Sequence, residues 1–169
     1  INSSLYLPAI QRPYVWEPAQ ITALFDSLLK GYPISSFLFW ELDSSRRGDW
    51  EIYKFIDNFR QGGMHNELAE TDGREVTLVL DGQQRLTSLL IGLRGTYTTK
   101  RKYARKENPD AWTKQRLYLD LMKSPKSDLN EGEADIGITY GLKFFEHTPR
   151  NSPDHHWFKV GSILDCTSD

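Results

Sequence analysis

The segment Val76–Leu90, which reads VTLVLDGQQRLTSLL, constrains the fold of this 169-residue chain more strongly than any other. Its apolar, β-branched run stops at Asp81-Gly82, and leucines with helical spacing begin at Leu86. This change of period predicts a buried strand that turns directly into a helix. Polar and charged groups then lie beside the free backbone N–H groups of a helix start, where an anion such as phosphate is favoured.

The rest of the chain predicts a mixture of strands and helices. Extended segments are expected at Ser4–Leu7, Phe37–Leu42, Val76–Leu80 and Arg116–Leu121, a strand or mixed segment at Ile136–Phe145, and amphipathic helices at 18–29 and 83–97. The apolar run 37–42 predicts a largely buried strand. The buried stripe of the second helix is expected to contain Leu86, Leu89, Leu90, Leu93 and Tyr97. We therefore expect an α+β fold (mixed α/β) that forms a single domain over residues 1–169.

Composition narrows the class of protein. The net charge of −2 argues against wholesale electrostatic wrapping of DNA. The single cysteine, Cys166, cannot form an intrachain disulfide, which is typical of a reducing, cytoplasmic setting. The chain has neither a secretory leader nor an apolar run of membrane-spanning length, so we expect a soluble protein with no membrane partner. Five cations in the seven residues Lys100–Lys106 predict either a solvated basic segment or a nucleic-acid patch.

The strand-to-helix turn offers two interpretations of its charges. Arg85 in the first helical turn opposes the helix dipole, so it needs either Asp81, four residues earlier, or a bound anion. In the second case the N–H groups and the Arg85 fork bind phosphate oxygens, and Gly82 lets the ligand approach the backbone. Asp81 would then hold a divalent cation or orient a water. Gln83 or Gln84 would position that water or bind a base or ribose.

A second segment, Gln11–Trp16, adds an arginine and two aromatic residues. If it is extended, Arg12, Tyr14 and Trp16 point to one side, as in a platform for a nucleobase with a cation for its phosphate. The alternative is that Trp16 packs on the following helix and Tyr14 covers the edge of the core. Other chemistry finds little support, because the chain has no P-loop and the adjacent His155-His156 cannot share one face as metal ligands.

These segments also carry a resemblance to a known family. The pieces are QRPYVW at 11–16, QI at 20–21, GYPI at 31–34 and LDGQQRLT at 80–87. In order, spacing and identity they resemble the N-terminal domain of GmrSD-type restriction endonucleases over about Leu5–Leu93, a family similar in fold to ParB and sulfiredoxin. The resemblance implies a small mixed sheet flanked by helices that binds and hydrolyses an NTP with a divalent cation such as Mg²⁺.

Together, the resemblance and the local chemistry define the expected site. The expected catalytic residues are Asp81, Gln84, Arg85 and Arg12, the expected nucleotide-binding residues are Gly82, Gln83, Gln11 and Tyr14, and Asp81 is the expected metal ligand.

The resemblance also implies the setting in which the domain acts. The chain is expected to be the N-terminal part of a longer DNA-restriction or phage-defence protein. Its expected partners are a nucleotide, DNA through the full-length protein, and a C-terminal nuclease region or partner subunit. We see no nuclease site in these residues. Two alternatives stay open: a ParB-like DNA-binding or sensing module without NTPase activity, and a scaffold in which Asp81 and Arg85 simply pair.

Overall fold

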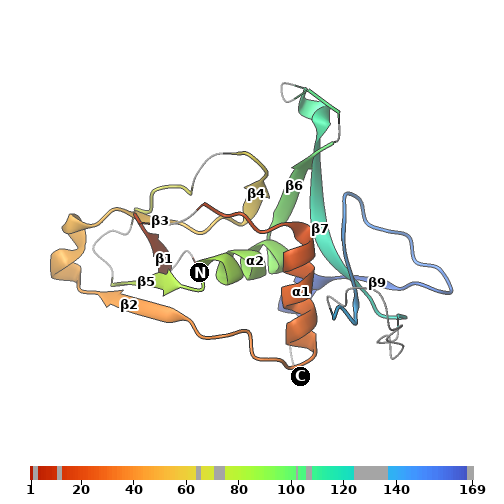
Figure 1. The fold of residues 1–169 in the computed structure, drawn as a ribbon, viewed down its shortest axis with the longest axis horizontal. Helices are drawn as coiled ribbons and strands as arrows, with labels where there is room; N and C mark the ends of the chain where they lie inside the picture. The colour runs from red at the N-terminus through yellow and green to blue at the C-terminus, as the bar shows by residue number, and fades with distance from the viewer. Residues whose placement is uncertain are drawn as a thin grey trace.

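The chain folds into two sheets with two α-helices between and beside them (Figure 1). The computed structural model describes residues 1, 4–10, 13–63, 66–70, 75–101, 103–105, 108–123 and 137–166, except the side chains of 44, 46, 47 and 109. In chain order the elements are β1 (Leu5–Pro8), α1 (Pro18–Leu29), β2 (Leu38–Leu42), the 3₁₀ turn η1 (Ser44–Asp49), β3 (Ile52–Tyr53), β4 (Asn58–Arg60), β5 (Val76–Asp81), α2 (Gln83–Leu93), β6 (Thr96–Lys100), η2 (Pro109–Ala111), β7 (Trp112–Asp120), β8 (Gly141–Phe145), β9 (Trp157–Lys159) and η3 (Val160–Asp165).

The first sheet has the strand order β2-β5-β1-β3. Its inner strand β5 runs parallel to β1 and antiparallel to β2. The β-branched and leucine residues of β5 bury the first part of this strand, with Leu78 and Val79 fully enclosed. Because β5 is fixed on both sides, the turn that follows it at Gly82 has a defined position.

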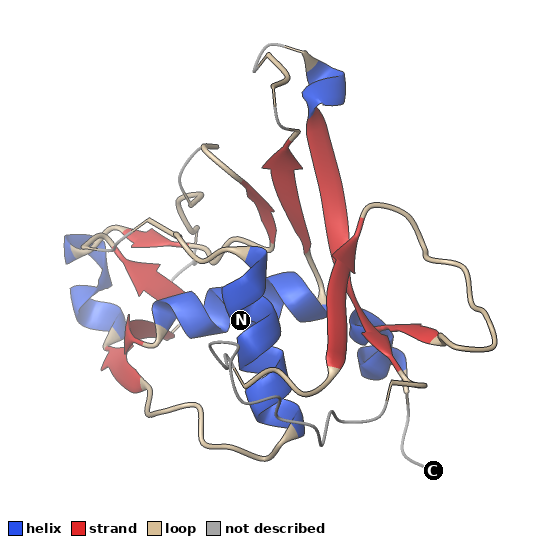
Figure 2. Ribbon diagram, turned by 45° about the vertical axis from the view of Figure 1, so that its right-hand side comes forward, coloured by secondary structure: helices blue, strands red, loops and turns tan. Residues whose placement is uncertain are grey.

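The second sheet has the order β4-β6-β7-β8, and β9 pairs with β7 as well. Strand β7 is its centre, with β6 and β9 along one edge and β8 along the other. The antiparallel hairpin of β6 and β7 projects well beyond the helices and carries η2 near its tip (Figure 2).

Helix α2 joins the two sheets through different sides of its surface. Leu86 and Leu90 pack against the first-sheet cluster of Leu7, Phe55 and Val79. On another side, Ile91 belongs to the main core cluster, whose buried members are Tyr14, Ile21, Phe25, Ile91, Tyr97 and Leu117. Gly92 allows α1 to approach closely, because a Cβ there would lie 2.4 Å from Cε2 of Phe25. None of the described helices combines the length and apolar character needed to cross a bilayer.

The structure confirms the α+β class and most expected elements. The strands form two sheets, however, and α2 ends at Leu93, so Tyr97 lies on β6 instead of the helix. The N–H of Gly95 bonds the carbonyls of Leu90 and Ile91 and ends the helix, and the threonine-rich segment that follows pairs as a strand.

Two expectations about burial were wrong. The fully buried residues of α2 are Thr87, Ser88, Ile91 and Gly92, whereas the predicted leucines are only partly buried. The reason is that the small residues of α2 face α1 and the core, while the leucines lie along the two edges of this buried side of the helix. Strand β2 is an edge strand, so Leu38, Phe39 and Trp40 are 56, 46 and 37% exposed rather than buried.

Asp26 on α1 connects that helix to the segment before β8. Its side chain is buried, and its Oδ1 accepts the N–H groups of Thr139 and Tyr140 at 2.8 and 2.7 Å. Its Oδ2 lies 2.7 Å from Nζ of Lys30. Burial raises the pKa of this carboxyl, but Lys30 and the two backbone donors outweigh that effect and hold the pKa below its ordinary 3.8.

Replacing Asp26 with alanine removes the acceptor of two partly buried N–H groups and the carboxylate partner of Lys30, which keeps its contact with the carbonyl of Gly137. We expect the free energy of unfolding at pH 7, measured by urea titration, to fall by about 2–3 kcal/mol. Glu67→Ala is the control, because it removes the exposed carboxylate that pairs with Lys54. We expect this change to lower the free energy of unfolding by less than about 0.5 kcal/mol. Since the folded-state pKa of Asp26 is lowered, its contribution holds above pH 3.8 and fades as the pH falls through the folded pKa. An equal difference between parent and variant at pH 7 and pH 2 would contradict this assignment.

Candidate functional site

The turn between β5 and α2 is built around Gly82. This residue is the N-cap of α2 with a φ of 88°, in the left-handed region. A Cβ at this position would lie 2.3 Å from Cδ1 of Phe37, so both backbone and space require glycine. The first intrahelical bond runs from the N–H of Leu86 to the carbonyl of Gly82. The N–H groups of residues 83–85 precede it, and Gly82 has no side chain to cap them.

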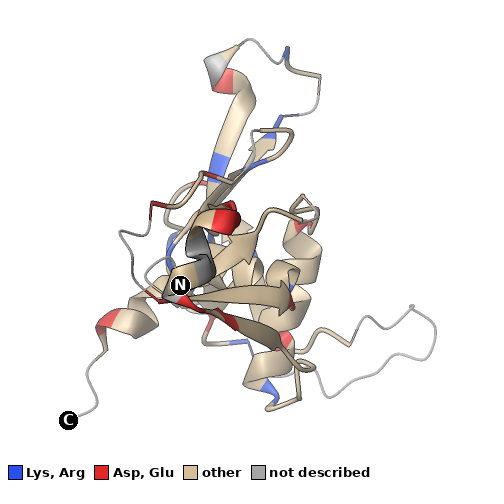
Figure 3. Ribbon diagram, turned by 90° about the vertical axis from the view of Figure 1, so that its left-hand side faces the viewer, with Lys and Arg blue, Asp and Glu red and all other residues tan. Residues whose placement is uncertain are grey.

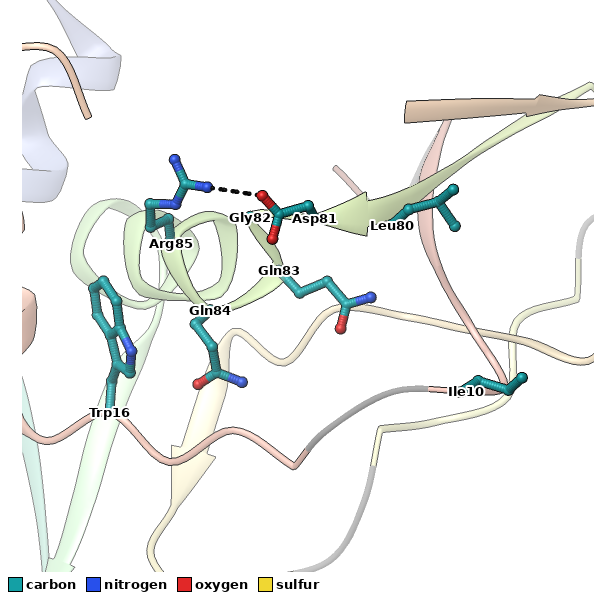
Figure 4. Close-up of a pocket in the computed structure, with 8 residues that line it drawn as sticks. All are labelled: Ile10, Trp16, Leu80, Asp81, Gly82, Gln83, Gln84 and Arg85. Atoms are coloured by element: carbon teal, nitrogen blue, oxygen red, sulfur yellow. Dashed lines mark hydrogen bonds and ion pairs between the residues drawn. The ribbon is translucent and has the colours of Figure 1, made fainter. Parts of the chain in front are cut away.

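A pocket of about 570 Å³ opens at this helix start (Figure 4). Its lining residues are Ile10, Trp16, Leu80, Asp81, Gly82, Gln83, Gln84 and Arg85. The structure therefore brings together all five predicted site residues from 81 to 85. They share this wall because Asp81 ends β5, Gly82 is the N-cap of α2, and the other three residues form the opening turn of that helix.

Arg85 is held by the backbone of the loop that precedes β2. Its Nη1 donates to the carbonyl of Ile34, and its Nη2 donates to the carbonyl of Ser36 at 2.7 Å. The guanidinium also lies 4.6 Å from the ring centre of Phe37, and the side chain is only 15% exposed. In this arrangement both Nη groups of the guanidinium donate to backbone carbonyls. The turn would therefore bind an anion mainly through its backbone amides, with Arg85 as a fixed positive charge beside them.

Asp81 remains open to the pocket. Its Oδ2 lies 3.5 Å from Nη2 of Arg85, so the predicted ion pair is present but long, and its side chain is 69% exposed. Such an exposed pair contributes little stability. Among the described residues, no group of three His, Cys, Asp or Glu side chains is placed to hold a metal. A cation at Asp81 would therefore depend on oxygens supplied by a ligand and by water.

The two glutamines make backbone contacts. Nε2 of Gln84 donates to the carbonyl of Pro13, and its Oε1 accepts the N–H of Val15, both at 3.1 Å. Gln84 thus holds the extended segment 13–15 against the helix start. Nε2 of Gln83 donates to the carbonyl of Val79 at 2.8 Å, and within the described chain its Oε1 has no hydrogen-bond donor. Of the other three expected site residues, Gln11 and Arg12 lie outside the described residues.

Of the two upstream aromatic residues, only Trp16 borders the pocket. Tyr14 is buried in the main core, where its hydroxyl lies 2.8 Å from Oγ of Ser88 and its ring packs edge-on against Phe59. Burial raises the pKa of the Tyr14 phenol. Tyr14 therefore occupies the core position that was the alternative to a nucleotide contact. The carbonyl of Trp16 accepts the hydroxyl of Tyr97 at 3.1 Å, which fixes the start of α1 against β6.

The side chain of His155 and the backbone N–H of His156 both contact one carboxylate, that of Asp120. Nδ1 of His155 lies 2.6 Å from Oδ2 of Asp120, whose Oδ1 accepts the N–H of His156 at 3.0 Å. These contacts hold the pKa of the Asp120 carboxyl below its usual value, mainly through His155. The arrangement ties the loop before β9 to the end of β7.

Sequence reasoning missed the partners of Arg85. The carbonyls of Ile34 and Ser36 give no signal in the side-chain pattern, and neither does the positive φ of 72° at Ser35. The available signal was Gly31–Ile34, a piece of the family pattern with no chemistry of its own. The structure explains that piece, because its last residue supplies an acceptor for Arg85.

Residues 1–154 match the N-terminal domain of the GmrSD restriction endonucleases. The chain belongs to this family. The match extends beyond the motif region and includes most of the second sheet as well as the first. No curated protein matches the chain. Membership in a restriction endonuclease family implies interaction with DNA and a role in restriction and phage defence.

Gly82→Ala is expected to disrupt this GmrSD-type turn. The change forces a side chain into the left-handed region and into the ring of Phe37. We expect the free energy of unfolding to fall by about 2 kcal/mol, measured by urea titration. Gly48→Ala is the matched control, because a Cβ there meets nothing within 4 Å. Equal stabilities of the two variants would show that the turn tolerates a side chain.

Proposed function

We propose that this domain binds an NTP at the β5–α2 turn and hydrolyses it in the service of DNA restriction. The observation that supports this most directly is that the uncapped N–H groups of residues 83–85 adjoin a pocket of about 570 Å³. Amides at a helix start favour phosphate oxygens through hydrogen bonds and the helix dipole. The fixed charge of Arg85 adds to this positive field.

Asp81 is the proposed contact for a divalent cation such as Mg²⁺. A Mg²⁺ ion in an NTP site is commonly bound by one or two carboxylates together with substrate phosphates and water. A single exposed carboxylate beside the proposed phosphate position fits that pattern. Such an ion would neutralise charge on the phosphate oxygens.

The other pocket residues have distinct proposed roles. Gln83 is proposed to orient an attacking water through its Oε1, which accepts no hydrogen bond from the described residues, while its Nε2 is anchored on the carbonyl of Val79. Gln84 positions the segment 13–15, which leads into α1, and Trp16 provides an aromatic wall for a nucleobase. The upstream Gln11 and Arg12 keep the contributing role that the family resemblance implies for them.

The scaffold alternative accounts for only part of this arrangement. It explains Arg85, whose carbonyl contacts fix the loop before β2. It gives no reason for an exposed carboxylate or for uncapped helix amides on a pocket wall. A turn needed only for folding would be more stable with a capping side chain.

Isothermal titration with a panel of NTPs tests the proposal, with Mg²⁺ and with EDTA. The parent is expected to bind an NTP in Mg²⁺. We expect Asp81→Asn to weaken binding in Mg²⁺ by roughly tenfold or more and to abolish NTP hydrolysis, with no difference in EDTA. Because Asp81 is exposed, thermal stability should change little. Glu67→Gln removes another exposed carboxylate, which lies away from the pocket, and is the control. A parent that binds no NTP, or an Asp81→Asn variant that binds equally well in Mg²⁺, would refute the proposal.

Arg85 needs a separate variant, because it also supports the fold. Arg85→Lys keeps a positive charge but cannot reach both carbonyls with a planar fork. We expect a lower melting temperature, measured by circular dichroism, together with weaker NTP binding. A variant with unchanged melting temperature would show that the carbonyl contacts contribute little.

A further inference from the structure

The side of the second sheet that faces away from α2 forms a distinct surface, here called the outer face. In β7, Leu117 belongs to the main core, so the alternation of side chains places the even-numbered residues 112–120 on the opposite side. Of these, Lys114 and Arg116 are exposed, whereas Tyr118 and Asp120 are buried. The strand registers extend this face to both edges of β7. Lys100 lies opposite Trp112, Phe145 lies opposite Arg116, and Lys143 and Lys159 lie opposite Tyr118 on either side.

Positively charged side chains gather on the outer face. Its basic strand residues are Arg60, Lys100, Lys114, Arg116, Lys143 and Lys159. Within the described part of the chain, none of them lies within 4.0 Å of a carboxylate oxygen. The only acidic strand residue of this face is Asp120, which is buried beneath His155. The face is therefore positively charged although the whole chain carries −2.

Two aromatic rings on the outer face are already covered by cations. The guanidinium of Arg60 lies 3.9 Å from the ring centre of Trp112, and Nζ of Lys143 lies 5.4 Å from that of Phe145. Surfaces that bind single strands present open rings on which bases stack. Here each of these two rings already has a cation over it, an arrangement that suits phosphate groups of a duplex whose bases are stacked with one another.

We propose that the outer face of the second sheet binds the phosphate backbone of double-stranded DNA. DNA is the duplex expected for a chain of a restriction endonuclease family. Lys114 and Arg116 project about 7 Å apart along one strand. The β6–β7 hairpin, on which Lys and Arg are visible in Figure 3, extends the face beyond the body of the domain. None of the pocket-lining residues belongs to it, so DNA and the proposed nucleotide occupy separate sites.

Fluorescence anisotropy with the intact protein and a labelled 20-base-pair DNA duplex tests this surface. Divalent cations are omitted, and binding is measured between 50 and 200 mM salt. Each phosphate contact contributes about 0.9 to the slope of log K against log salt. Lys114→Ala/Arg116→Ala is therefore expected to reduce that slope by about 2 and to weaken binding roughly tenfold or more. Lys143→Ala/Lys159→Ala, on the two flanking strands, is expected to act in the same direction.

The controls separate this surface from other effects. Lys54→Ala removes an exposed cation that belongs to neither sheet and should leave slope and affinity unchanged. Circular dichroism establishes that each variant is folded. NTP binding by both double variants should equal that of the parent, so a failure of the DNA surface is distinguishable from a failure of the nucleotide site.

Several outcomes would overturn the proposal. The first is that both double variants bind the duplex with the parent's affinity and salt slope. The second is that the parent does not bind the duplex. The third is that single-stranded DNA or an RNA duplex of the same length binds more tightly than the DNA duplex.

Discussion

The contact between the Arg85 guanidinium and the carbonyls of Ile34 and Ser36 determines where the candidate site lies. It fixes the loop before β2 against the start of α2 and places Phe37 over Gly82. Backbone carbonyls that point inward need donors, and one planar group with several N–H bonds supplies two of them at once. The opening of α2 is thereby rigid although it has no side-chain cap, and its amides remain available to a ligand.

These contacts give a physical explanation for the motif pieces by which the chain resembles the GmrSD family. The DGQQR segment binds the segment 13–15 through Gln84 and the loop after α1 through Arg85. Three pieces that are distant in sequence therefore meet at one turn. Residues that look like candidates for catalysis also hold the site together, which is why variants at Asp81 are more informative about function than variants at Arg85 or Gln84.

Much of the fold could be predicted from the sequence, because β5 and α2 follow clear periodic patterns. Tyr97 was misplaced because a leucine stripe was extended past Gly95, whose helix-ending role and following threonines were the available signal. The exposure of β2 could not be predicted, since an apolar run reads the same at the edge of a sheet as inside it. The pocket residues 81–85 could be predicted because they are adjacent in sequence. The carbonyl acceptors of Arg85 could not, because every residue has a backbone carbonyl whatever its side chain.

Helix α1 is tethered at both of its ends. Near its start, the segment 13–16 is bonded to Gln84 and to Tyr97, and near its finish Asp26 bonds the chain just before β8. Because an α-helix is stiff along its axis, a displacement at one end of α1 is expected to reach the other end. Hydrogen bonds at the two ends of α1 therefore link the opening of α2, which follows β5 of the first sheet, to the segment before β8 of the second sheet.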